Sequence, residues 1–284
     1  MTTAAQAQEI DGDVHVHPVY LAGSLHIGDP ALQPVLDLPH TESHHDELGN
    51  FFVSTADGRI RIGFIPEQDW DTLWKIAVAP DAFAEPAWVA NFSADTPIEI
   101  VTAVTTELAG MYRLDDNAWL SERTADPVEW IAPYAAAGWN ARDVERGRLT
   151  LRSPDNLASI TYRQQPLHPQ DAEQAGQDGR YTIGTINSAG WYGRFSSGTP
   201  ARILEAAATA ALDPAPVVRY RDALDYYARR TATITPITAP VPSPLDVQRA
   251  AARVRSAPRI IRSAPAIGAS NVVWTSTTPA GRRR

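Results

Sequence analysis

Two stretches of the chain repeat the same order of hydrophobic and polar positions. Residues 88–108 read WVANFSADTPIEIVTAVTTEL and residues 191–211 read WYGRFSSGTPARILEAAATAA, so that eight of 21 positions are identical at an offset of 103. Hydrophobic residues in each stretch first alternate with period two, which predicts a strand, and then recur at helical spacing, which predicts an amphipathic helix. The chain therefore contains an internal duplication.

The identical positions have recognisable structural roles. They include Trp88, Phe92, Thr96 and Pro97 in the first copy and Trp191, Phe195, Thr199 and Pro200 in the second. A threonine directly before a proline begins a helix, because its hydroxyl can accept from an unpaired amide and proline lacks an amide hydrogen at the first helical position. Glu99 would complete a capping box in the first copy. We expect the aromatic rings to lie in the core.

Further strands precede both stretches. The expected strands are residues 51–54, 59–65 and 73–78 in the first copy and 149–152, 157–163 and 181–186 in the second. Turns at residues 57–58 and 154–156 close the hairpins, and helices begin at Asp29 and Asp126. The predicted fold is α+β: two repeated helix–four-strand–helix units, with antiparallel sheets that form a pseudo-twofold pair.

The expected organisation continues beyond the second unit. The first unit spans residues 14–112, the second spans residues 120–230, and a mostly disordered tail spans residues 231–284. Tyr220, Leu224 and Tyr227 recur at helical spacing, which predicts an amphipathic helix over residues 217–230. The tail is rich in Pro, Ala, Ser, Thr and Arg, a composition typical of disordered segments.

Charge is distributed unevenly along the chain, although its net value is only −8. Residues 1–127 contain 21 acidic and 5 basic residues, residues 128–230 contain 11 and 12, and residues 231–284 contain one acid and eight arginines. An acidic first half repels phosphate at long range while the arginine tail attracts it. We therefore expect the two ends to prefer different partners.

Composition and missing motifs exclude several classes of protein. The chain has no cysteine, which excludes disulfides, thiolate nucleophiles and zinc fingers. It has neither an apolar run of the ~20 residues that a membrane helix needs nor a signal-like start, so we expect a cytoplasmic protein with no membrane partner. The motifs Gly-x-Ser-x-Gly, His-Glu-x-x-His, Walker A and Gly-x-Gly-x-x-Gly do not occur. We expect no cofactor and lean against an enzyme.

The repeated landmarks resemble those of a known family. The segments that carry the resemblance are Val19-Tyr20-Leu21-Ala22-Gly23, the Asp57-Gly58 turn, Trp88 to Pro97, and Ser153-Pro154-Asp155. They are similar to the SPDY-motif domain of unknown function, which usually occurs in tandem in actinobacteria. The first copy departs from the motif, with Ser54-Thr55-Ala56-Asp57-Gly58 where the motif has Ser-Pro-Asp. The resemblance covers about residues 14–212, implies a fold-level identity and transfers no catalytic residues.

One cluster of possible metal ligands stands out. His40, Glu42, His44, His45, Asp46 and Glu47 lie within eight residues, and His15 and His17 lie upstream on one face of an expected strand. Imidazole and carboxylate groups suit zinc or another divalent ion, so His40, His44 and His45 are candidate ligands. The alternative, which we prefer, is a hydrated loop insertion, because the cluster falls between a helix and a strand.

Two features point to nucleic acid. Arg148, Arg152 and Arg163 lie on expected strands of the second copy near aromatic residues, and exposed aromatic rings beside arginines can form a stacking groove for single strands. The tail adds Arg249, Arg253, Arg255, Arg259 and Arg262, which would release counterions from phosphate. Alternatively, the aromatic rings belong to the core and the tail serves as a solubilising or protein-docking arm.

Three functions follow in order of preference. The first is a non-catalytic binding module that contacts nucleic acid through the second unit and the basic tail. The second is a protein-interaction or regulatory module whose acidic first unit docks on a basic partner. The third is a metal-dependent enzyme at residues 40–47.

Overall fold

The computed structural model describes residues 12–24, 28–66, 72–114, 117–121, 126–145, 147–165, 179–186 and 190–237. All of these residues belong to one compact unit, which ends at Ile237. None of the helices in this described part is long and apolar enough to cross a membrane.

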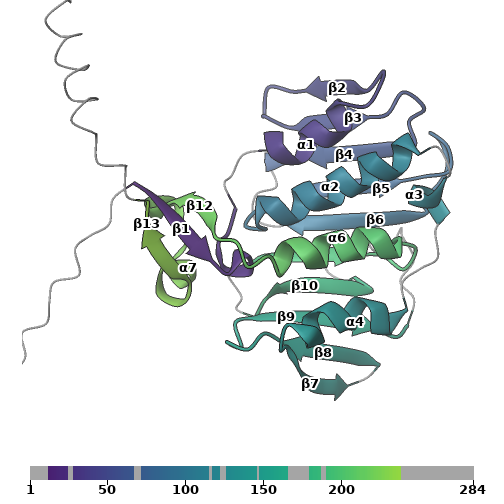
Figure 1. The fold of residues 1–284 in the computed structure, drawn as a ribbon. Coiled ribbons are helices and arrows are strands. Elements are labelled where there is room, and N and C mark those ends of the chain that lie inside the picture. Colours follow the sequence, from purple (N-terminus) through teal and green to yellow (C-terminus); the bar gives the residue numbers. More distant parts are fainter. Residues whose placement is uncertain are drawn as a thin grey trace, which may run out of the picture. The chain divides into compact units, whose positions relative to one another are not determined.

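One antiparallel sheet of ten strands runs through this unit (Figure 1). From one edge to the centre, its strands are β2 (Glu42–His45), β3 (Phe51–Ser54), β4 (Ile60–Phe64), β5 (Thr72–Val78) and β6 (Trp88–Ser93). From the centre to the other edge, they are β11 (Tyr192–Phe195), β10 (Tyr181–Thr185), β9 (Ala158–Arg163), β8 (Arg148–Arg152) and β7 (Asn140–Glu145). Each half of the sheet is thus built by one half of the chain.

The central pair of strands, β6 and β11, joins the two halves. Asn91 pairs with Arg194, which lies 103 positions later in the sequence, and Phe92 pairs with Gly193. The rings of Phe92 and Phe195 meet edge to face, with 5.5 Å between their centroids. Because the pairing is continuous across the centre, both halves share one hydrophobic core.

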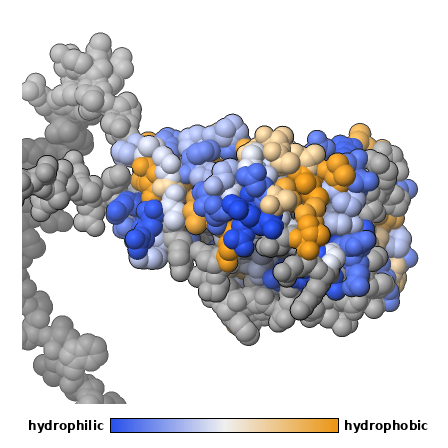
Figure 2. Space-filling view, turned by 90° about the horizontal axis from the view of Figure 1, so that it is seen from below, coloured by the Kyte–Doolittle hydropathy of each residue, from blue (hydrophilic) through white to orange (hydrophobic). Residues whose placement is uncertain are grey.

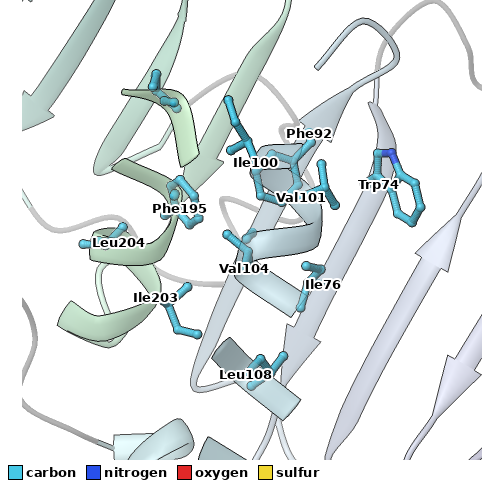
Figure 3. Close-up of a cluster of buried hydrophobic side chains, with 14 of the residues drawn as sticks. Trp74, Ile76, Phe92, Ile100, Val101, Val104, Leu108, Phe195, Ile203 and Leu204 are labelled. Atoms are coloured by element: carbon cyan, nitrogen blue, oxygen red, sulfur yellow. The ribbon is translucent and has the colours of Figure 1, made fainter. Parts of the chain in front are cut away.

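Four helices lie on the same face of this sheet (Figure 1): α1 (Asp29–Leu36), α2 (Ile98–Arg113), α4 (Pro127–Ala136) and α6 (Ala201–Ala211). A short helix, α3 (Ala118–Ser121), follows α2. Ile100, Val104 and Leu108 of α2 are completely buried and point toward strand residues that include Phe92 and Ile76 (Figure 3). The helices therefore use their hydrophobic stripe to cover one face of the sheet.

A second antiparallel sheet has three strands, in the order β12 (Val217–Tyr220), β1 (Asp13–His17) and β13 (Thr233–Pro236). Short helices η1 (Val19–Leu21), η3 (Arg221–Ala223) and α7 (Tyr226–Thr231) accompany it. Arg219 of β12 is only 2% exposed, and its guanidinium donates to both carboxylate oxygens of Glu99 on α2, at 2.8 and 2.6 Å. This ion pair attaches the small sheet to the first turn of α2.

The α+β class with antiparallel sheets is confirmed, but each half has five strands of the large sheet where the sequence predicted four. The additional strands are β2 and β7, at the two edges of the sheet. All four residues of β2 are exposed, so the period-two pattern of a half-buried strand is missing there. This strand exists because it pairs with β3, and β7 exists because it pairs with β8.

The expected helix over residues 217–230 is wrong. Val217 and Val218 pair with β1, and only residues 226–231 are α-helical. The expected tail boundary moves as well, because residues 233–236 form β13 and the compact unit ends at Ile237.

The capping box at Thr96 and Glu99 is also wrong, since Glu99 is engaged by Arg219 and the Thr96 hydroxyl donates to the carbonyl of Tyr192. The helix start expected at Asp126 is confirmed, and Asp126 and Glu129 form a capping box there.

Candidate functional site

The face of the large sheet opposite α1, α2, α4 and α6, called here the helix-free face, holds the most coherent set of polar side chains. Successive side chains of a strand point to opposite faces, so residues that flank a core residue lie on the helix-free face. In β9, Ala158, Ile160 and Tyr162 are buried, which places Thr161 and Arg163 on the helix-free face. The hydroxyls of Thr150 and Thr161 lie 3.3 Å apart there.

All charged residues of the eight inner strands, β3–β6 and β8–β11, are basic. These strands contain no aspartate or glutamate, although acids outnumber bases by 33 to 25 in the whole chain. The basic residues, all on the helix-free face by alternation, are Arg61, Lys75, Arg148, Arg152, Arg163 and Arg194. A surface lined by one sign of charge concentrates ligands of the opposite sign.

A single row of paired positions crosses the centre of this face. Lys75 pairs with Asn91, Asn91 with Arg194, and Arg194 with Thr182. Thr182 then pairs with Thr161, and Thr161 pairs with Thr150. Because neighbouring strands are about 4.8 Å apart, these six positions extend over about 24 Å. The row combines two cations with amide and hydroxyl groups that can donate to, or accept from, a polar ligand.

Tyr192 and Arg194 form a stacked pair on this face. The Arg194 guanidinium carbon lies 3.5 Å from the centroid of the Tyr192 ring, and the Tyr192 hydroxyl lies 2.8 Å from the hydroxyl of Thr72. Stacking on the ring limits the motion of the arginine head group. Arg194 is thereby held near the centre of the row, with its charge unneutralised by any ion pair among the described residues.

A cleft of about 430 Å³ opens on the helix-free face above β2, β3, β4 and β5. Phe52, Gly63 and Ile65 supply an apolar floor, and Arg61 of β4 and Lys75 of β5 also line the cleft. Phe52 is 41% exposed, which is unusual for a phenyl ring on a strand. The volume is within the range of about 300–1,000 Å³ found for small-molecule sites.

The predicted stacking groove in the second copy is wrong, although its arginines are on strands as expected. Trp191, Tyr162 and Tyr181 are at most 9% exposed, and all three pack in the core, on the opposite face from the arginines. Burial raises the pKa of Tyr181 to about 12. The alternative interpretation, that these rings are structural, is confirmed. Arg249, Arg253, Arg255, Arg259 and Arg262 lie outside the described residues.

The eight landmark residues of the duplication are buried as expected. They are Trp88, Phe92, Thr96, Pro97, Trp191, Phe195, Thr199 and Pro200. The same residue types therefore recur in the two copies because they pack in the protein interior.

The candidate metal ligands are not brought together. His40 lies in a turn with φ of 57°, and His44 and His45 are neighbours on β2, so their side chains point to opposite faces. His45 stacks on Phe51, with 6.4 Å between ring centroids. Across the described ranges, no three histidine, aspartate or glutamate side chains are placed to hold a metal ion.

The two hairpin turns share one hydrogen-bond pattern. In the first copy, the Thr55 hydroxyl donates to Asp57, and the Asp57 carboxylate also accepts from the amide of Arg59. In the second, the Ser153 hydroxyl donates to Asp155, which accepts from the amide of Leu157. A tyrosine hydroxyl approaches each aspartate: Tyr112 donates to Asp57 at 3.1 Å, and Tyr20 donates to Asp155 at 3.0 Å. Both aspartates are therefore structural.

Arg61, Lys75 and Arg194 were not among the candidates from sequence, yet a signal for them existed. Each alternates with buried residues on its strand, and no acid shares that strand. What the sequence pattern did not show is that β6 pairs with β11, which places the cations of both copies on one surface.

At the β7 end of the molecule, the described residues form a mixed surface. Seen from that end (Figure 2), hydrophobic residues are interspersed with hydrophilic ones. Val144 of β7, for example, is 79% exposed.

Comparison with protein families gave one result. Residues 55–113 and 152–217 each match the model of the SPDY domain, a domain of unknown function (DUF317). The two matches include both hairpin turns and both central strands. No curated protein matches the chain. No solved structure matches it either.

Proposed function

We propose a function for this tandem SPDY-domain protein from its geometry, because the family has no assigned activity. The helix-free face binds nucleic acid, prefers single strands and catalyses no reaction. The observation that carries the proposal is the charge of the inner strands, which hold six basic and no acidic residues in an acidic protein. Phosphate backbones bind such surfaces by releasing counterions.

The shape of the face favours single strands over duplexes. Reading a duplex groove requires a helix or a two-stranded ribbon that projects into it, and the described part of the helix-free face presents neither. A single strand can lie along a sheet, with its phosphates on arginines and its bases against exposed rings. Phe52 and Tyr192 are the aromatic residues of inner strands on this face.

The binding face depends on the duplication, and we infer that the two halves are related by a pseudo-twofold axis between Asn91 and Arg194. These residues are equivalent in the two copies, and they pair with each other. The indole of Trp88 donates to the carbonyl of Trp119, just before the second copy, whereas the indole of Trp191 donates to the carbonyl of Tyr20, near the start of the first. Such a reciprocal exchange is the pattern of a symmetric dimer whose chains have been joined.

The tail extends the same function. Its arginines would add electrostatic affinity wherever a bound strand leaves the sheet, as the sequence predicts for Arg249, Arg253, Arg255, Arg259 and Arg262. The acidic residues of the first half, which lie outside the inner strands, would then limit unspecific binding to the rest of the surface.

A salt series tests the proposal. Binding of a fluorescent single strand of about 12 nucleotides to the full chain is measured by anisotropy between about 50 and 200 mM salt. The Arg152→Gln, Arg163→Gln double variant should weaken binding and reduce the slope of log K against log salt by about one to two. Arg202→Gln is the matched control, since Arg202 is on helix α6 and pairs with Glu107. Equal slopes for the wild type and the double variant would refute the proposal.

A second candidate function is recognition of a protein strand at the edge of the sheet. Strand β2 pairs only with β3 among the described strands, and its four residues are exposed. A peptide could add to this edge by backbone hydrogen bonds. A Ser43→Pro variant, which removes one donor from the edge, would abolish capture of such a partner and leave nucleic-acid binding unchanged.

A further inference from the structure

The cleft above β2–β5 has a chemistry of its own, because it combines an apolar floor with two neighbouring cations on β4 and β5. Phe52 pairs with Gly63, and Gly63 pairs with Lys75, so these three positions follow one another across the sheet. Arg61 pairs with Ala77 on the same strands, which makes Arg61 and Lys75 diagonal neighbours about 7 Å apart. Their two head groups can therefore reach the same anion.

The floor of the cleft is open because residue 63 is glycine. A Cβ atom built there would lie 3.4 Å from the Phe52 ring and 3.4 Å from Ile65. A larger side chain at this position would therefore fill the space above the phenyl ring. The backbone of Gly63 does not need a positive φ, so the missing side chain is not explained by a turn, and we attribute it to the cleft.

The opposite wall of the cleft is polar. Glu42 and His44 of β2 share the face of the cleft, and Ser54 of β3 lies between Glu42 and Arg61. A carboxylate at that wall repels a second anion and accepts hydrogen bonds from hydroxyl or amino groups. The cleft is thus suited to a ligand with an anion at one end, a planar ring in the middle, and hydrogen-bond donors at the other end.

We propose that this cleft binds one nucleoside monophosphate unit, with the phosphate on Arg61 and Lys75, the base over Phe52 and Gly63, and donors of the sugar or base toward Glu42. The choice of a nucleotide over another aromatic anion rests on the proposed function, since the cleft is continuous with the cationic inner strands. The unit has two sources with the same chemistry: a free mononucleotide, or the phosphorylated end of a bound strand.

Calorimetric titration of the full chain tests this assignment. The probes are AMP, adenosine, inorganic phosphate, and one oligonucleotide with and without a 5′ phosphate. AMP should bind at least about tenfold more tightly than adenosine or phosphate, because only AMP uses both the floor and the cations. Gly63→Val should weaken AMP binding about tenfold or more, whereas Thr233→Val, an exposed strand position of the small sheet, should not.

The outcomes separate this site from the proposed function. If Gly63→Val loses AMP binding while the Arg152→Gln, Arg163→Gln double variant keeps AMP binding, the cleft is supported as a separate site. A 5′ phosphate that strengthens oligonucleotide binding only when residue 63 is glycine identifies the strand end as the source. Oligonucleotide binding without any AMP binding or 5′-phosphate effect overturns the cleft assignment and leaves the proposed function standing. Absence of all binding overturns both.

Discussion

Ser93 and Ser196 make the same hydrogen bond in opposite directions across the centre of the sheet. The Ser196 hydroxyl accepts from the amide of Val89 at 2.9 Å, and the Ser93 hydroxyl accepts from the amide of Tyr192 at 2.9 Å. The two serines are 103 residues apart, and so are the two amides. Each serine closes the central strand pair at one end, where the regular ladder stops.

This relationship predicts equal stability costs. Ser93→Ala and Ser196→Ala should each lower the free energy of unfolding by about 1–3 kcal/mol, because each leaves a backbone amide at one end of the central ladder without its acceptor. Urea unfolding of the full chain, with Ser159→Ala at a partly exposed position of β9 as the control, measures both. A near-zero cost for one serine beside a large cost for the other would argue against equivalent roles.

The ion pair between the buried Arg219 and the partly exposed Glu99 predicts an asymmetric response. Glu99→Ala leaves a cation that is 2% exposed without its partner and should cost about 3–5 kcal/mol. Glu99→Gln keeps one acceptor and should cost less. Thermal unfolding measures the difference. Equal melting temperatures for Glu99→Ala and the wild type would show that the small sheet does not depend on this pair.

The first hairpin turn predicts a pH effect on stability. Burial opposes ionisation of Asp57, but hydrogen bonds from Thr55, the Arg59 amide and Tyr112 outweigh it and hold the pKa of Asp57 below its usual value of 3.8. A carboxylate whose folded-state pKa is lowered stabilises the fold above the unfolded-state pKa, and this contribution is lost as the pH falls through the folded-state pKa. The stabilisation should therefore be complete at neutral pH and should decline as the pH falls below 3.8 toward the lower folded-state pKa.

Asp57→Asn measures this contribution. The variant should be less stable than the wild type by about 1 kcal/mol at neutral pH, and the difference should shrink on acidification. Asp222→Asn, whose side chain is 61% exposed, serves as the control. A difference that stays constant down to about pH 3 would contradict the role of the ionised form.

Local pattern was sufficient for much of the fold. Alternation located the inner strands, and the helix starts at Pro97, Asp126 and Pro200 followed from capping chemistry. Edge strands were missed because pairing with a neighbour, rather than burial, creates them. Residues 217–220 were misassigned because the burial of Arg219 depends on Glu99, 120 residues away. Such a contact leaves no periodic signal in the sequence.

The candidate site was recoverable only in part. Arg148, Arg152 and Arg163 were identified on the correct strands, but they were grouped with Tyr162, which strict alternation places on the opposite face. The cationic face also needs Lys75 and Arg194, and these meet only through the non-local pairing of β6 with β11.

The most direct measurement reverses the charge at the centre of the helix-free face. Affinity for a single-stranded oligonucleotide is compared between the wild type, Arg194→Glu, and Arg221→Glu, the last being an arginine of η3 outside the large sheet. We predict that Arg194→Glu binds at least about tenfold more weakly, while Arg221→Glu binds like the wild type. Equal affinity for Arg194→Glu and the wild type would contradict nucleic-acid binding on this face.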